Sequence, residues 1–210
     1  MGFRGRTVPA LRLDGRRLQG SRTISRALDE LYPEPLLFPR EPERRAAVER
    51  AEEWGDEVLQ PLARRLTWAS LKRDRATIGS FLEGARLGIP HGVAACTAAP
   101  LVLLSARLND ASDEAARADL AALPGHLAKV DGLIAEGVLG GRERNAEDFQ
   151  IATSLRLLTT LDDLRPSIAG RPAGRLAEAV VPRFPGRVNA VFPADWLAPL
   201  REPAAAGSGP

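Results

Sequence analysis

The stretch Arg6–Ile24, RTVPALRLDGRRLQGSRTI, has the pattern of a β-hairpin followed by a helix. Apolar and polar residues alternate through VPALRL, as they do in a half-buried strand. The dipeptide Asp14-Gly15 then predicts a two-residue turn, because both positions of a type I′ turn need a positive φ. RRLQ is the expected returning strand. Pro9 lies inside the first strand, where proline is confined to edges or special backbone positions.

The sequence after this stretch is mainly helical in pattern. Ser21 is expected to be the N-cap of a helix over residues 21–32, in which Ile24, Leu28 and Leu31 share one face. The proline-rich stretch YPEPLLFPREPE reads as a linker. Pro61 is expected to kink the helix predicted near residues 42–72. Further helices are predicted near residues 42–72, 74–88, 92–107, 113–136, 145–163 and 172–181.

The clearest helix start is the stretch LGGRERNAEDFQIA. Asn145 stands where an N-cap is expected, and Asp148 follows three residues later. This spacing predicts a capping box, in which each side chain bonds the other residue's backbone N–H group. We assign Asn145 and Asp148 a structural role without chemistry.

The charge of the chain is balanced overall but uneven along it. The 210 residues include 29 basic and 27 acidic ones, for a net charge of +2, which does not indicate a nucleic-acid partner. Residues 1–26 nevertheless hold seven arginines against one acid, Asp14, a local excess of +6. Only Lys72 and Lys129 are lysines, a bias that we attribute to a GC-rich genome.

The remaining composition favours a cytoplasmic protein without a membrane segment. The single cysteine, Cys96, excludes an intramolecular disulfide, and its apolar neighbours predict a buried, inert thiol. The apolar run GVAACTAAPLVLLSA is too short to span a bilayer and is interrupted by Pro100, so we expect a core helix. His91 and His126 stand alone, and no metal site is predicted.

The order of these parts resembles the glutathione S-transferase superfamily over roughly residues 3 to 185. That family joins a thioredoxin-like domain to an all-helical domain. The resemblance implies a mainly α fold: a truncated thioredoxin-like piece of hairpin plus helix, followed by an all-α bundle. The implied boundaries are 1–38 for the thioredoxin-like part, 39–187 for the helical domain and 188–210 for an extended or disordered tail.

The family's motifs imply a binding site for glutathione. The Val8-Pro9 bond matches the family's cis-proline, whose preceding residue faces the cysteinyl part of the ligand. The Gly20-Ser21 pair matches the dipeptide that receives the γ-glutamyl end. A helix N-terminus with a serine also suits a carboxylate on physical grounds. Gly20 departs from the family's acidic or glutamine residue and cannot pair with the ligand's ammonium group.

The resemblance also bears on the second substrate and on catalysis. Arg65 and Trp68 match the helix that borders the electrophile groove, so they are candidates for that wall. The family's catalytic Tyr, Ser or Cys lies ahead of the Val-Pro turn, and only seven residues precede Val8. We therefore expect the catalytic residue to lie outside the 210 residues, and the chain alone to show no conjugating activity.

Three functions stay open from the sequence. The first is a transferase that joins glutathione to an electrophile, and the resemblance implies that such a protein is a homodimer. The second is a non-catalytic binding or interaction module of the same fold. The third is a transferase that uses a different low-molecular-weight thiol. None of them involves a metal, a nucleic acid or a membrane.

Overall fold

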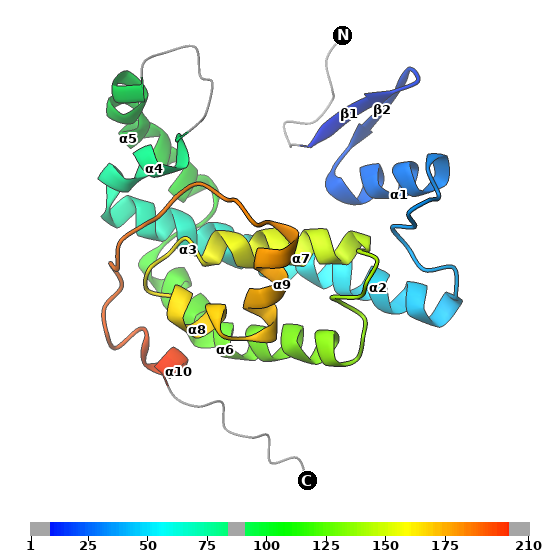
Figure 1. The fold of residues 1–210 in the computed structure, drawn as a ribbon. Helices are drawn as coiled ribbons and strands as arrows, with labels where there is room; N and C mark the ends of the chain where they lie inside the picture. Colours follow the sequence, from blue (N-terminus) through cyan, green and yellow to red (C-terminus); the bar gives the residue numbers. More distant parts are fainter. Residues whose placement is uncertain (1–8, 84–90, 202–210) are drawn as a thin grey trace.

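The computed structural model describes residues 9–83 and 91–201, and residues 91–97 by their backbone alone. The part of the chain that it describes is mainly helical, with a small two-stranded antiparallel sheet near the N-terminus. Figure 1 shows the hairpin and its helix beside a larger bundle of helices. This confirms the expected mainly α class.

The hairpin forms as its sequence predicts. Strand β1 (Ala10–Leu13) pairs with β2 (Arg16–Gln19), with Leu11 opposite Leu18 and Arg12 opposite Arg17. Asp14 and Gly15 between them have φ values of 48° and 79°, as a type I′ turn requires. Helix α1 (Ser21–Leu31) follows and covers β2, where Leu18 and Ala27 are buried.

The linker after α1 is held in place by the backbone and by the side chain of Phe38. The Asp29 carboxylate of α1 accepts hydrogen bonds from the backbone N–H groups of Leu37 and Phe38, at 2.8 and 3.2 Å. The Phe38 ring is fully buried, and the guanidinium groups of Arg26 and Arg45 lie over it. The linker is therefore anchored to α1 on one side and to α2 (Pro42–Trp54) on the other.

A long helical rod forms one side of the bundle. It consists of α2 (Pro42–Trp54), the π-helical turn η1 (Gly55–Leu59) and α3 (Gln60–Arg73). Pro61 has no N–H group to bond the carbonyl four residues earlier. The Gln60 N–H group bonds the Gly55 carbonyl five residues earlier, and this π turn accommodates the proline where a kink was expected.

The rest of the bundle packs around α7. Helix α7 contacts α2, η1, α3 and α9, and its buried face includes Ile151, Leu155 and Leu158. The other elements are η2 (Arg75–Thr77), α4 (Ile78–Phe81), α5 (His91–Leu108), α6 (Asp113–Ala135), α7 (Ala146–Leu158), α8 (Arg165–Ala169), α9 (Pro172–Val180) and α10 (Ala198–Arg201).

Two expected helices are shorter than predicted. The helix expected over 74–88 does not form as one helix in the described residues: Asp74 is non-helical, at φ −124° and ψ 81°, and only the short η2 and α4 follow. Residues 84–88 of that prediction lie outside the described residues. The helix expected over 145–163 ends at Leu158, where the chain turns to meet the C-terminal segment.

The C-terminal segment was expected to be extended or disordered from residue 188, and disorder is wrong for residues 188–201. Val188 is fully buried and forms a parallel bridge with Leu161. The Asp163 carboxylate accepts hydrogen bonds from the N–H groups of Val191 and Phe192, at 2.8 and 3.0 Å. These bonds hold the segment against the bundle. Residues 202–210 lie outside the described residues.

Among the helices of the described residues, none has both the length and the apolar character that crossing a bilayer would require.

Candidate functional site

The candidate site is the turn from β2 into α1, where three of the expected ligand-binding residues meet. The Gly20 N–H group donates a 3.0 Å hydrogen bond to the Pro9 carbonyl, so Pro9 lies beside the Gly20-Ser21 pair. Val8 and the Val8-Pro9 peptide bond, which we expect to be cis, lie outside the described residues.

The N-cap of α1 is Gly20, and the prediction that Ser21 would be the cap is wrong. Gly20 has φ 87° and ψ 144°, and Ser21 is the first residue of the helix. A positive φ is accessible to glycine at little cost, whereas a serine at this position would be strained.

The first turn of α1 leaves hydrogen-bonding groups open. Helical bonding begins with the Ile24 N–H group, which bonds the Gly20 carbonyl at 3.1 Å. Among the described residues, the N–H groups of Ser21, Arg22 and Thr23 and the Ser21 hydroxyl have no hydrogen-bond partner. Unpaired N–H groups and the positive end of the helix dipole favour an anion at this place.

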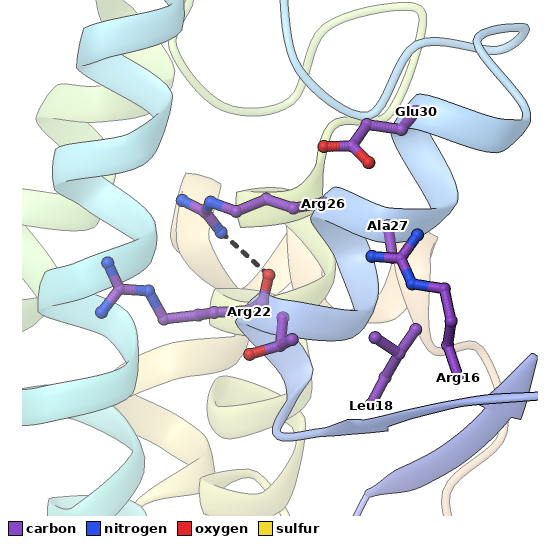
Figure 2. Close-up of a pocket in the computed structure, with 7 residues that line it drawn as sticks. Arg16, Leu18, Arg22, Arg26, Ala27 and Glu30 are labelled. Carbon is purple, nitrogen blue, oxygen red and sulfur yellow. Dashed lines mark hydrogen bonds between the residues drawn. The ribbon is translucent and has the colours of Figure 1, made fainter.

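A hollow of about 560 Å³ opens between β2 and α1, and Arg22, the residue after Ser21, is part of its lining (Figure 2). It is lined by Arg16, Leu18, Arg22, Thr23, Arg26, Ala27 and Glu30. Figure 2 shows Arg16 and Leu18 reaching in from β2, while Arg22 and Arg26 extend away toward the bundle. Ser21 itself does not line this hollow.

Two of the three arginines that line the hollow are already in ion pairs. Arg26 bonds Glu52 of α2 at 2.8 Å, and Arg22 lies 3.8 Å from Glu52 and 3.5 Å from Glu53. Arg16 has no ion-pair partner among the described residues. The arginine excess of the N-terminal segment is therefore used in part to attach α1 to α2.

Arg65 and Trp68, the residues expected to line an electrophile groove, make their recorded contacts within the helical bundle. Arg65 of α3 forms a bidentate pair with Asp119 of α6, with both N–O distances at 2.7 Å, and these bonds raise the pKa of Arg65. Trp68 is half-buried against the main core. Among the described residues, Arg22 and Arg26 of α1 form their ion pairs with α2, whereas Arg65 forms its ion pair with α6.

The capping box of α7 is present at the predicted residues. The Asn145 side chain accepts from the Asp148 N–H group and the Asp148 carboxylate accepts from the Asn145 N–H group, both at 3.0 Å. Asp148 also accepts from the Gly140 N–H group at 2.7 Å, which ties the preceding loop to the helix. The arrangement orders α7 and contributes no group to the α1 turn.

The described residues offer few candidate metal ligands or reactive side chains. Within residues 9–83 and 91–201, no three His, Cys, Asp or Glu side chains gather as a metal would need. The rings of His126 and Trp54 lie 5.7 Å apart with their planes tilted by 49°, and burial lowers the pKa of His126. The side chains of His91 and Cys96 lie outside the described residues.

Two buried glutamates were missed by the sequence reasoning. Glu52 is only 2% exposed and accepts from Ser25 and Arg26 of α1. Glu147, at the start of α7, is fully buried, and neither of its carboxyl oxygens has a partner. Burial, with the nearby charges of Asp148 and Glu52, raises the pKa of Glu147 to about 9. In the sequence both stand in runs of charge typical of a solvent-exposed helix face.

Comparisons of the chain with protein families, curated proteins and solved structures found no match.

Proposed function

We propose that this chain is a glutathione S-transferase-like protein that binds a small thiol for conjugation to an electrophile. In this proposal the γ-glutamyl carboxylate of glutathione, or of a related thiol, lies at the N-terminus of α1 beside Ser21. The cysteinyl backbone lies along Val8-Pro9. The open first turn of α1 is the observation that carries the proposal, because it offers unpaired donors and a positive dipole end to a carboxylate.

The order of the elements supports the architecture behind this proposal. A hairpin and a helix are followed by an anchored linker and by a bundle whose α7 begins with a capping box. We assign residues 1–38 to a thioredoxin-like part and residues 39–187 to a helical domain of glutathione S-transferase type. The same resemblance carries the proposals of a homodimer and of a cytoplasmic location.

A non-catalytic binding module is the second candidate, and Gly20 favours it. Its positive φ requires glycine, so no side chain at this position can accept a bond from the ligand's ammonium group. Binding would then depend on the carboxylate end and would select anionic ligands more broadly than glutathione.

Binding is tested by calorimetric titration with glutathione and with S-methylglutathione, which has no free thiol. We expect Ser21→Ala to weaken both by roughly tenfold, because a hydrogen bond to a charged group is lost. The matched control is Ser25→Ala, whose hydroxyl bonds the Arg22 carbonyl and Glu52 and which should leave the affinity unchanged. Equal affinities for wild type and Ser21→Ala would overturn the placement.

Turnover with 1-chloro-2,4-dinitrobenzene tests the transferase directly. In this reaction the thiolate sulfur bonds the ring carbon, chloride leaves, and the thiol proton passes to solvent. Conjugation above the uncatalysed rate would establish the transferase. Binding without turnover is expected of the 210-residue chain under both candidates. Binding of other carboxylate ligands as tightly as S-methylglutathione would favour the binding module.

A further inference from the structure

A second hollow, of about 470 Å³, lies between the linker, the start of α2 and the loop from α6 to α7. Figure 1 shows the start of α2, the end of α6 and the start of α7 on the same side of the bundle. Val48 is part of the small core around Phe38, and Val138 packs against this core. The apolar residues that line the hollow are Leu36, Pro39, Ala47, Val48 and Val138. The hollow therefore has an apolar floor and the size of a small-molecule site.

Hydrogen bonds between the elements fix the walls of this hollow. The Ala146 N–H group bonds the Leu37 carbonyl at 2.9 Å, which joins the linker to the start of α7. The Asn145 side-chain amide donates a 2.9 Å bond to the Val138 carbonyl, which joins the preceding loop to the same helix. A ligand that enters walls already in place loses less affinity to ordering them.

The linker and the start of α2 form a basic wall of the hollow. Arg40 and Arg44 line it together with Glu41. The Glu41 carboxylate is used by the cap of α2, because its oxygens accept from the N–H groups of Glu43 and Arg44 at 2.9 and 2.7 Å. In the part of the chain that the structure describes, the guanidinium groups of Arg40 and Arg44 have no hydrogen-bond or ion-pair partner. This wall therefore suits a carboxylate.

The end of α6 and the loop after it form an acidic wall. Glu136 and Glu143 line it against one arginine, Arg142. Within residues 9–83 and 91–201, neither glutamate side chain has a hydrogen-bond or ion-pair partner, and no ion pair between described residues crosses the hollow. The two walls therefore have opposite excess charge, and together they suit a ligand that carries a carboxylate at one end and an ammonium group at the other.

We propose that this hollow binds a short apolar peptide, of two or three residues with free termini. The peptide's carboxylate lies at Arg40 and Arg44, its ammonium group lies at Glu136 and Glu143, and its apolar side chains cover the floor. A free amino acid carries both charges on one carbon, whereas an extended tripeptide spans up to about 10 Å and reaches both walls. The hollow shares no lining residue with the one at α1, so the proposal does not depend on the thiol site.

The test is calorimetric titration of the full chain with trileucine. We expect Arg44→Gln and Glu143→Gln each to weaken binding at least tenfold, because each removes a charge-assisted contact. Arg50→Gln on α2 and Glu178→Gln on α9 are the matched controls, since both residues are exposed and neither has an ion-pair partner among the described residues. Absence of binding to the wild-type chain, or unchanged affinity in either Arg44→Gln or Glu143→Gln, would overturn the proposal.

Modified peptides test which wall holds which end. We expect N-acetyl-trileucine to bind weakly and to be insensitive to Glu143→Gln, and trileucine amide to be insensitive to Arg44→Gln. Reversed sensitivities would overturn the placement. Laurate that binds more tightly than trileucine and is unaffected by Glu143→Gln would identify a site for anions alone. Weaker trileucine binding in Ser21→Ala would place the peptide at the α1 turn; either result would overturn the proposal.

Discussion

Glu147 stands at the second position of α7 and is fully buried without a hydrogen-bond partner. Water is excluded, so the charged form of the carboxyl is disfavoured, and the charges of Asp148 and Glu52 add to this effect. The opposing charge of Lys129 of α6 is too weak to reverse it, and the pKa of Glu147 rises from 4.5 to about 9. At neutral pH this side chain is a neutral acid.

The raised pKa of Glu147 makes the folded state sensitive to alkali. Between the ordinary value of 4.5 and about 9, the folded state holds a proton that the unfolded state has released. The free energy of unfolding therefore falls as pH rises, by up to ~1.4 kcal/mol per pH unit from this group. Glu147→Gln should remove this slope and raise stability at pH 8, measured by urea unfolding.

The control for Glu147→Gln is Glu57→Gln, since Glu57 is exposed on the neighbouring π turn. Its variant should keep the wild-type pH slope. An unchanged slope in Glu147→Gln would show that Glu147 is already ionised in the folded protein.

Asn145 contributes through the backbone of α7. Asn145→Ala removes the side-chain acceptor for the Asp148 N–H group and should lower the free energy of unfolding by about 0.5–2 kcal/mol. Thiol affinity should stay nearly constant, because this residue orders α7 and not α1. Thermal unfolding and titration with S-methylglutathione measure the two effects; lost binding with an unchanged Tm would contradict the structural role.

Two aspartates in the turn after α7, Asp162 and Asp163, bond the C-terminal segment and the residue before it. Asp163 bonds two of its backbone N–H groups, and Arg187 bonds Asp162 at 2.8 Å. Val188, Phe192 and Leu197 then add to the main core. The turn after Leu158 is thus an attachment point.

Replacement of Asp163 should release this segment. Asp163→Ala leaves the N–H groups of Val191 and Phe192 without an acceptor, at a cost of about 1–3 kcal/mol each where they are buried. We expect faster amide exchange across residues 188–201 and a lower Tm. Asp195→Ala is the control: Asp195 is exposed and lies 3.9 Å from Arg117, so its loss should change stability by less than about 1 kcal/mol.

The hairpin and α1 lie beside the larger bundle of helices (Figure 1), and side chains of α1 attach them to α2. Glu52 is the centre of this attachment, with Ser25, Arg22 and Arg26 of α1 around it. Asp29 and the buried Phe38 fix the linker beside it. A two-stranded hairpin is marginally stable alone, so its order depends on this contact.

Glu52→Ala should therefore undock the N-terminal part while the bundle stays folded. Removing this carboxylate leaves Arg22 and Arg26 without their shared buried partner. Amide exchange of residues 9–31 should become at least tenfold faster, while α6 and α7 keep their protection. Glu49→Ala, which breaks only the half-exposed pair with Arg45, should change neither region.

In the wild-type protein we expect the residues up to 38 to be the least protected from exchange. The helical bundle has its own continuous core, whereas the hairpin contributes little to it. Protection of residues 9–31 equal to that of α7 would show that the two parts unfold as one unit.

Features set by neighbours in the chain were predictable from the sequence. The Asp14-Gly15 turn and the Asn145–Asp148 capping box depend on φ preferences and on side chains that reach three residues along the chain. The start of α2 at Pro42 follows from the same kind of rule. The Gly20 cap escaped prediction because a positive φ at that position is imposed by how β2 meets α1.

Features that join distant residues appear only once the chain is folded. Glu147 and Glu52 are buried by residues from distant parts of the chain. Arg65 pairs with Asp119, and Asp163 holds Val191 and Phe192, although these positions are far apart in sequence. Local pattern treats charged residues as solvated, because nothing nearby in the chain reports what will pack over them. Amphipathic spacing and caps therefore determine where helices form, whereas tertiary packing decides which polar groups lose water and which backbone donors at the α1 turn stay unpaired among the described residues.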